Sequence, residues 1–384
     1  MTTHSQKIDY WLFFSVIALI FLGQLFLSIL SASLSLTKFG NTYYFLFHQL
    51  IYGVLFGLVL GFAFFKMPLR FLQKIAPILF FSNLAFLILV FFPQIGARFG
   101  GAARWLGLGN IIFQPSEFLK ITSIIYLASW LQSRGYSGLQ KGGVFKKPLA
   151  SHRKKEKYAL KQVFFPFLFF LGVISIIFIF QPDISTLAII FSTLLVMYFG
   201  ARTPLWQNAL IVLVASIIFL ILIILAPYRF SRITTFLNPE SDPLGISFQM
   251  KQSSIAIGSG GILGRGLGMS SQKFGFIPQS MSDSIFAIFA EETGFIGSFV
   301  LISLFLLFLW RGLRIAKLAE DKFCYLAALG ITFWIVFQGF INISSMAGLF
   351  PLIGIPLPFI SYGGSHLVAE LIGVGILLNI SSKV

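Results

Sequence analysis

The chain consists of long apolar runs separated by short polar or basic segments. Most runs extend for about 20 residues, the length with which an α-helix crosses a bilayer. They are continuous, whereas the strands of a membrane β-barrel alternate apolar and polar positions. The pattern therefore predicts an all-α polytopic membrane protein with about ten transmembrane helices. The predicted spans are Trp11–Ser31, Tyr44–Phe65, Leu72–Phe92, Ile112–Leu131, Val163–Phe180, Ile184–Gly200, Gln207–Ala226, Ser284–Trp310, Phe323–Ala347 and Pro358–Ile380.

The loops between the spans differ in their content of Lys and Arg, which predicts their side of the membrane. One set is rich in these residues, notably at 66–74, 134–161 and 311–322, and is predicted to be cytoplasmic together with both termini. The other set then faces outward. It includes a large extracytoplasmic loop between spans 7 and 8, residues 227–283, within a single membrane domain over residues 1–384.

Composition supports a membrane protein and narrows its function. Of the 384 residues, 57% are hydrophobic and only 10% are charged. The formal net charge of +16 could suit a nucleic-acid partner. Most Lys and Arg lie in loops between apolar runs, however, so the charge reports membrane orientation and no nucleic-acid binding is expected. The single cysteine, Cys324, excludes an intramolecular disulfide and a cysteine metal cluster.

One acid stands where the large outward loop ends and the eighth span begins. This residue is Asp283, and Ser282 precedes it. Either side chain could cap the helix by accepting hydrogen bonds from its first N–H groups. The helix N-terminus would also favour an ionised carboxylate. An ionised, outward-facing Asp283 could accept a proton from a sugar hydroxyl or hold a divalent cation on a diphosphate, and both roles are compatible with a cap.

Charged side chains inside the predicted spans are costly unless they are paired. Glu291 and Glu292 lie two helical turns inside the eighth span, roughly 12 Å deep. Lys120 reaches a similar depth in the fourth span, one turn from Glu117. We therefore expect Lys120 to pair with Glu291 or Glu292, either as a structural ion pair or as the lining of a polar cavity below Asp283. The last span adds two polar residues to which the sequence assigns no role, His366 and Glu370.

Cations in the outward loops suit a phosphate-bearing lipid substrate, because guanidinium and ammonium groups bind phosphate oxygens. The sequence GSGGILGRGLG lets the backbone bend or approach a ligand, but no strand–turn–helix unit surrounds it, so it is not a nucleotide fingerprint. Any one of these cations, taken alone, is more readily explained as an interface residue than as a ligand. No set of metal ligands is evident. The candidate substrate-binding residues are Arg104, Lys120, Lys251, Gln252, Arg265, Lys273, Glu291 and Glu292.

Four motifs together resemble one protein family. They are GAARWLGLGNIIFQPSEFLKI (Gly101–Ile121), QPDIST (Gln181–Thr186), the stretch Phe248–Gly297 and GLFPLIGIPLPFISYGGS (Gly348–Ser365). Their order and spacing, across nearly the whole chain, are similar to those of the SEDS family (shape, elongation, division and sporulation). The resemblance implies a ten-helix protein of the inner membrane. It also implies a peptidoglycan glycosyltransferase that polymerises lipid II, the undecaprenyl-diphosphate-linked disaccharide-pentapeptide, at the outer face.

The same resemblance implies partners and a catalytic residue. SEDS proteins work with a class B penicillin-binding protein, the transpeptidase that crosslinks the glycan, and with other divisome proteins. The essential aspartate of the family matches Asp283. Two positions depart from the family, which usually has Glu at Gln279 and commonly has Thr-Asp-Phe at Ser282-Asp283-Ser284. The loop motifs look more like division-type members than elongation-type members.

The reaction implied by the resemblance is a single displacement with inversion at the donor sugar. It needs one base and no covalent intermediate, and Asp283 would be that base. Outward-loop cations, with Mg²⁺ or Mn²⁺ as the candidate cofactor, would stabilise the leaving diphosphate. Two other functions fit the sequence: a lipid II flippase, because polar groups inside spans suit a transport path, and a non-catalytic scaffold for the transpeptidase.

Overall fold

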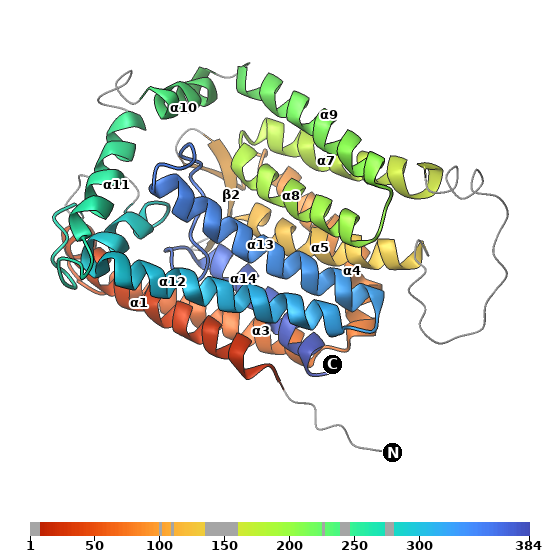
Figure 1. The fold of residues 1–384 in the computed structure, drawn as a ribbon, viewed down its shortest axis with the longest axis horizontal. Coiled ribbons are helices and arrows are strands. Elements are labelled where there is room, and N and C mark those ends of the chain that lie inside the picture. Colours follow the sequence, from red (N-terminus) through yellow and green to blue (C-terminus); the bar gives the residue numbers. More distant parts are fainter. Residues whose placement is uncertain are drawn as a thin grey trace.

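Long apolar helices lie side by side and form a bundle in the computed structural model of the chain (Figure 1). The structure describes residues 8–99, 102–108, 111–134, 160–224, 227–238, 246–272 and 280–384. The bundle contains α1 (Tyr10–Phe39), α2 (Tyr44–His48), α3 (Phe56–Lys66), α4 (Leu69–Leu89), α5 (Pro115–Ser133), α7 (Phe165–Phe180), α8 (Ile184–Gly200), α9 (Leu205–Ile224), α12 (Ile285–Leu318), α13 (Lys322–Met346) and α14 (Gly364–Ser381). Two π-helical segments precede α3 and α7, namely η1 (Gln49–Leu55) and η2 (Leu160–Phe164).

Within the described residues, 8 helical stretches are long and apolar enough to cross a membrane, with α2, η1 and α3 counted as one. Each of the ten predicted spans contains a helix, but two differ from the rest. α8 is apolar and only 17 residues long. α5 carries Glu117 and Lys120 and is buried along much of its length. The all-helical membrane fold therefore agrees with the prediction, whereas the number of spans stays a prediction.

The centre of the bundle is α14, whose residues from His366 to Ser381 are all buried. It packs against α3, α5 and α13, as expected for a helix that is apolar on every side. α14 and its neighbouring helices approach closely where they carry small residues. A Cβ built at Gly375 would lie 2.1 Å from the carbonyl oxygen of Gly61, so the backbones of α14 and α3 touch here.

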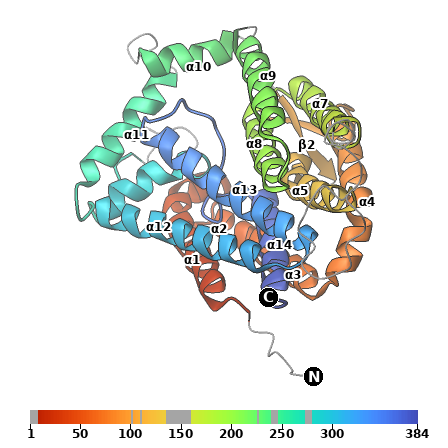
Figure 2. The same ribbon diagram turned by 45° about the vertical axis from the view of Figure 1, so that its right-hand side comes forward.

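Additional elements gather at the end of the bundle opposite the C-terminus (Figures 1 and 2). Two helices, α10 (Pro227–Leu237) and α11 (Ile246–Gly260), lie within the predicted loop 227–283, and α11 packs against α12. A small antiparallel sheet has the order β1-β2-β3. Its strands are β1 (Gly96–Phe99), β2 (Ala102–Leu108) and β3 (Ile111–Phe113).

Two predicted spans begin too early. The fourth starts at Pro115, where a proline suits the first helical turn, because the residues before it form β3. The tenth starts at Gly364, because the six predicted residues before it leave the helix. Phe359, in that segment, has a φ of 64°, which no α-helix contains.

Candidate active site

Asp283 lies in the turn that leads into α12, and its side chain is partly exposed. The N-cap of α12 is Ser284, whose side chain makes no capping hydrogen bond. Its hydroxyl accepts instead from Gln249 Nε2 on α11, at 2.9 Å. The alternative that Ser282 or Asp283 caps the helix is therefore wrong.

One side of Asp283 is bordered by residues 347–363, here called the α13–α14 loop. Asn342 on α13 donates through Nδ2 to the carbonyls of Asp283 and Ile355, at 2.8 and 2.7 Å. At Gly354, φ is +67° and a Cβ would lie 3.3 Å from Asp283 Oδ2. The loop backbone therefore runs beside the carboxylate, and glycine keeps this space clear of a side chain.

The same loop fixes the residues just before Asp283. Ser361 Oγ donates to the carbonyl of Ser282 at 2.6 Å, and the backbone N–H of Tyr362 donates to the carbonyl of Met281 at 2.8 Å. Both contacts use the backbone of the turn. They set its path whatever the charge of the Asp283 side chain.

Two arginines are held at this end of the bundle by backbone carbonyls. Arg232 on α10 donates through Nη1 to the carbonyl of Leu352 in the α13–α14 loop, at 3.1 Å. Arg104 on β2 donates through Nη2 to the carbonyl of Pro182, between α7 and α8, at 2.5 Å. Both positive charges favour the ionised form of Asp283. The contacts bring elements from distant parts of the chain to one cationic site.

The environment of Asp283 moves the pKa of its carboxyl toward neutral pH. Burial raises the pKa of its carboxyl from the ordinary 3.8 to about 6, and the Asp183 carboxylate adds to the rise. Arg232, the Ser282 hydroxyl and Arg104 act in the opposite direction and lower this pKa. A base with a pKa near the working pH is largely ionised yet accepts a proton readily.

Glu291 and Glu292 bind the glycine-rich turn that follows α11, residues 261–272. Glu291 accepts a hydrogen bond from Ser270 Oγ and pairs with Arg265, whose Nη1 is 3.2 Å from Oε1. Glu292 accepts from the backbone N–H of Ser270 at 3.3 Å. These three predicted substrate-binding side chains, the two acids and Arg265, thus contact the protein's own chain and attach the turn to α12.

Lys120 pairs with Glu117 on its own helix. Its Nζ lies 2.7 Å from Glu117 Oε2 and donates to Gln338 Oε1 on α13 at 2.8 Å. The predicted pairing with Glu291 or Glu292 is wrong. The reason is that α5 packs against α13 and α14, whereas the two acids of α12 face the turn after α11.

The Lys120 cluster reaches the α13–α14 loop through Gln338. This side chain donates from Nε2 to the carbonyl of Pro356 at 3.0 Å and accepts from Trp334 Nε1 at 3.0 Å. The ion pair therefore lies beneath the loop that borders Asp283. The polar cavity predicted below Asp283 stays a prediction.

The other predicted ligands lie on or after α11. Lys251 is exposed and Gln252 is partly buried. Gln249 faces the start of α12, and Lys251, two positions further, points to the opposite side of the helix. Lys273 lies outside the described residues, as does Gln279, where the family usually has Glu.

Several residues that build the site were missed from the sequence. They act through backbone contacts across the fold, which a sequence pattern does not reveal. A polar side chain inside an apolar run was the available signal for two of them, Asn342 and Gln338. The other two, Gly354 and Ser361, belong to a motif that was noted without a role for its members.

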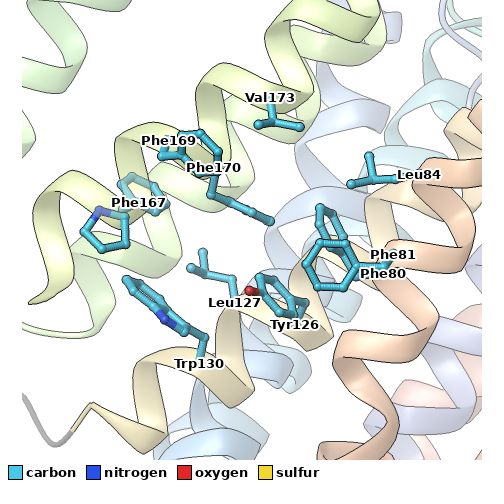
Figure 3. A pocket seen from close by; sticks show the side chains of 11 residues that line it. Phe80, Phe81, Leu84, Tyr126, Leu127, Trp130, Phe167, Phe169, Phe170 and Val173 are labelled. Atoms are coloured by element: carbon cyan, nitrogen blue, oxygen red, sulfur yellow. The ribbon is translucent and has the colours of Figure 1, made fainter. Parts of the chain in front are cut away.

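A separate pocket of about 160 Å³ lies between α4, α5 and α7 and is lined mainly by aromatic side chains, among them Phe80, Tyr126, Trp130 and Phe170 (Figure 3). Its lining carries no charged side chain. Burial of a diphosphate without paired charges would be very costly, so this pocket does not suit the charged part of a lipid substrate.

Comparison with known proteins supplies the family. A family model described as "Cell cycle protein", which covers FtsW, RodA and SpoVE, matches residues 10–384. This chain belongs to the SEDS family. Its resemblance to SEDS proteins, first seen in four motifs, thus extends over nearly the full length.

SEDS relatives match the chain from end to end. Stage V sporulation protein E of Bacillus subtilis is 37% identical over 381 residues, 99% of each chain. A protein of Coxiella burnetii named "Probable peptidoglycan glycosyltransferase FtsW" is 36% identical over 383 residues, 99% of this chain and 98% of its own.

Solved SEDS-like structures confirm the all-helical membrane fold. RodA of Thermus thermophilus has a TM-score of 0.66 at 25% identity, over 98% of this chain and 97% of its own. A second structure reaches 0.72 at 26% identity over 98% of each chain. Its description is "Structural coordination of polymerization and crosslinking by a peptidoglycan synthase complex".

Proposed function

We propose that this SEDS protein polymerises lipid II into glycan strands with Asp283 as the general base. The chain is a peptidoglycan glycosyltransferase, since it matches the family model over residues 10–384 and relatives with that name are 36% identical. The observation that supports the role of Asp283 is its setting. Burial raises its pKa to about 6, its carboxylate stays partly exposed beside Gly354, and two arginines lie within electrostatic range.

The proposed step is one displacement. The acceptor hydroxyl gives its proton to the Asp283 carboxylate while its oxygen forms a bond to the anomeric carbon of the donor sugar. The bond from that carbon to the diphosphate oxygen breaks, and the electron pair leaves with undecaprenyl diphosphate. Attack from the face opposite the leaving group inverts the donor centre, so one carboxylate is sufficient.

Arg104 and Arg232 supply the positive charge for the leaving group. Negative charge develops on the diphosphate as the glycosidic bond forms, and fixed cations in a partly buried site stabilise it strongly. Both guanidinium groups are already held by backbone carbonyls, at 2.5 and 3.1 Å, so they need little reorganisation. We propose them ahead of Lys251, which points away from the turn of Asp283.

A divalent cation would have one carboxylate of this chain at the site. Asp183 already accepts hydrogen bonds from the N–H and hydroxyl of Thr186. Within the described residues, no group of three His, Cys, Asp or Glu side chains could hold a metal ion. Mg²⁺ or Mn²⁺ would therefore bind chiefly through the substrate phosphates and neutralise their charge, which leaves the Asp283 carboxylate available to accept the proton.

The proposal also covers the orientation of the protein in the membrane and its partner. The chain is a multi-pass membrane protein, and we propose that the end with Asp283, α10 and α11 faces outward while both termini are cytoplasmic. Charge supports this orientation, since the opposite end carries Arg70, Lys74, Arg311 and Arg314. We propose a class B penicillin-binding protein as the partner, because a similar chain belongs to a complex that couples polymerization to crosslinking.

We further propose that this glycosyltransferase acts in cell division. Several relatives at 33–36% identity carry the name FtsW, whereas the relative at 37% is a sporulation protein. Sequence identity alone separates these roles poorly. Depletion followed by microscopy distinguishes them: loss of septa supports division, and loss of rod shape supports elongation.

The flippase alternative receives less support. A flippase needs polar groups that continue from one face of the bundle to the other. In the described part of the chain, the buried Lys120 cluster connects through Gln338 to the α13–α14 loop at the outer end. Transport of fluorescent lipid II across proteoliposomes, without polymer formation, is the outcome that would favour it.

Substitution of Asp283 tests the proposal. Asp283→Asn keeps the size of the side chain and removes the base, so lipid II polymerisation by the purified protein should fall at least about 100-fold. Glu320→Gln makes the same change in charge at an exposed position before α13 and should leave the rate unchanged. Polymer of normal length and yield from Asp283→Asn would refute the role.

A further inference from the structure

The α13–α14 loop contains a strained residue held by a buried acid. Phe359 has a φ of 64°, in the left-handed region that residues with a Cβ disfavour. Its backbone N–H donates to Glu370 Oε2 on α14 at 2.8 Å. The Glu370 side chain is completely buried. Such a conformation persists only where the surroundings hold it, and the carboxylate supplies the acceptor here.

The strained residue precedes two residues that determine the path of the turn that carries Asp283. Ser361 accepts a hydrogen bond from the N–H of Leu357 at 2.8 Å and donates its own proton to the carbonyl of Ser282 at 2.6 Å. Tyr362 then donates from its N–H to the turn at Met281. A change in the backbone at position 359 therefore shifts both contacts.

Neighbouring helices pack against the other sides of the α13–α14 loop. A Cβ built at Gly23 on α1 would lie 2.5 Å from the carbonyl oxygen of Phe359, so the two backbones touch. Gln49 in η1 accepts from the N–H of Gly363 at 3.0 Å. With these contacts in place, loss of the Glu370 oxygen would leave the N–H of Phe359 in a packed site without its acceptor.

We infer that Glu370 is a positioning residue for the polymerase reaction: by accepting the Phe359 N–H it holds the loop that places the turn of Asp283. The inference rests on the proposed function of Asp283. The role belongs to the acceptor oxygen and not to the charge. The second oxygen of Glu370, Oε1, makes no hydrogen bond within the described part of the chain.

Two substitutions of Glu370 separate the effect of its acceptor oxygen from the effect of its charge. Glu370→Gln keeps an oxygen that can accept from Phe359 and should hold kcat for lipid II polymerisation within about threefold of the unchanged protein. Glu370→Leu removes the acceptor at similar volume. It should lower kcat at least tenfold while KM changes less than threefold, because the binding residues stay in place. Glu370→Met, which is unbranched and adapts to irregular cavities, replaces it where the leucine variant does not fold.

Asn379 offers a matched control at the other end of α14. It donates through Nδ2 to the carbonyls of Phe64 and Met67, at 3.0 and 2.6 Å. Asn379→Leu should lower thermal stability about as much as Glu370→Leu and leave kcat within twofold. A loss of kcat that simply follows stability in both variants would overturn the inference.

The pH profile of the reaction provides a second measurement. A general loss of stability does not change the position of its acid limb. A loosened turn admits water to Asp283, and lower burial reduces the pKa of its carboxyl. The acid limb of kcat/KM should therefore shift to lower pH in Glu370→Leu and stay in place in Asn379→Leu. An unshifted limb, or an equal loss of kcat in Glu370→Gln and Glu370→Leu, contradicts the inference.

The activities of the Asp283 and Glu370 variants, taken together, distinguish failure of this inference from failure of the proposed function. Full activity of Asp283→Asn removes the proposed base, and the positioning role falls with it. Inactive Asp283→Asn together with fully active Glu370→Leu overturns only the positioning role. Inactive Asp283→Asn, impaired Glu370→Leu and active Glu370→Gln support both.

Discussion

At the scale of residues, two acids at the end of the bundle opposite the C-terminus have different surroundings. Asp183 is the N-cap of α8 and accepts from the N–H and the hydroxyl of Thr186, at 3.3 and 2.9 Å. Asp283 makes no cap, and burial raises the pKa of its carboxyl to about 6. The difference arises from what surrounds each carboxylate, because the two side chains are chemically identical. It gives Asp183 a structural role and suits the role of base that we propose for Asp283.

The pKa of Asp283 predicts how activity depends on pH. The base works in its ionised form, so kcat/KM should be constant above pH 7 and fall about tenfold per pH unit below the pKa of about 6. An Asp with the ordinary pKa of 3.8 would keep its activity to about pH 4. The measurement is the initial rate of lipid II polymerisation at substrate concentrations well below KM.

A charge variant checks that the acid limb belongs to Asp283. Arg232 lowers the pKa of Asp283, so Arg232→Gln should raise that pKa and move the acid limb to higher pH. Thermal stability measured over the same pH range excludes unfolding as the cause. A limb that stays in place, or moves to lower pH, contradicts the assignment.

At the scale of elements, α12 and the glycine-rich turn 261–272 form one unit. The N–H groups of Arg265 and Gly266 donate to the carbonyls of Glu291 and Glu292, at 3.0 and 3.1 Å. These carbonyls are available because α12 departs from helical geometry at Gly294, with φ of 66° and ψ of −161°. The kink thus allows backbone pairing between a helix and a turn at membrane depth, where unpaired groups are costly.

Two glycines near this contact should respond differently to an added methyl group. At Gly264, φ is +81° and a Cβ would lie 2.2 Å from the carbonyl oxygen of Glu292. Gly264→Ala should therefore destabilise the protein by at least ~2 kcal/mol. At Gly258, inside α11, a Cβ meets nothing within 4 Å. Gly258→Ala should be neutral or stabilise the helix by about 0.5–1 kcal/mol.

Thermal unfolding of both variants in one detergent provides the comparison. The two changes add the same atoms to neighbouring segments, so differences in detergent binding largely cancel. Equal melting temperatures for the two variants would show that the turn is not packed against α12 as described.

At the scale of the whole molecule, the proposed active site and the basic residues at the helix ends lie at opposite ends of the bundle. Asp283 precedes α12, Arg104 lies on β2 and Arg232 lies on α10, and α10 and α11 are at the end of the bundle opposite the C-terminus (Figure 1). Basic residues at the ends of α3, α4, α12 and α13 lie toward the end with the C-terminus. Lipid II exposes its sugars on one face of the membrane, so the orientation of the bundle decides whether Asp283 can reach them.

Labelling of single cysteines tests this orientation. Ser271, in the glycine-rich turn, and Ser133, at the end of α5, are both exposed. In a Cys324→Ser background, Ser271→Cys should react with a membrane-impermeant maleimide on intact spheroplasts. Ser133→Cys should react only after lysis. The reverse pattern would place Asp283 in the cytoplasm and end the polymerase proposal.

The sequence by itself determined the class of the protein and its predicted sidedness, and it singled out Asp283 as a candidate. Long apolar runs and the distribution of Lys and Arg are local properties of the chain, and they act directly on its insertion into a bilayer. An acid between a polar loop and an apolar span is likewise visible in one stretch of sequence, and the resemblance to the SEDS family supplied its candidate role.

Only the tertiary structure decided which residues meet. Lys120 bonds Gln338, 218 positions away, and Asn342 holds the carbonyl of Asp283 across 59 positions. Depth in the membrane suggested a different partner for Lys120, since depth does not tell which faces of two helices adjoin. The pKa of Asp283 and the hydrogen bond from Phe359 to Glu370 likewise depend on burial by distant segments. Packing creates that burial, and no single stretch of sequence contains it.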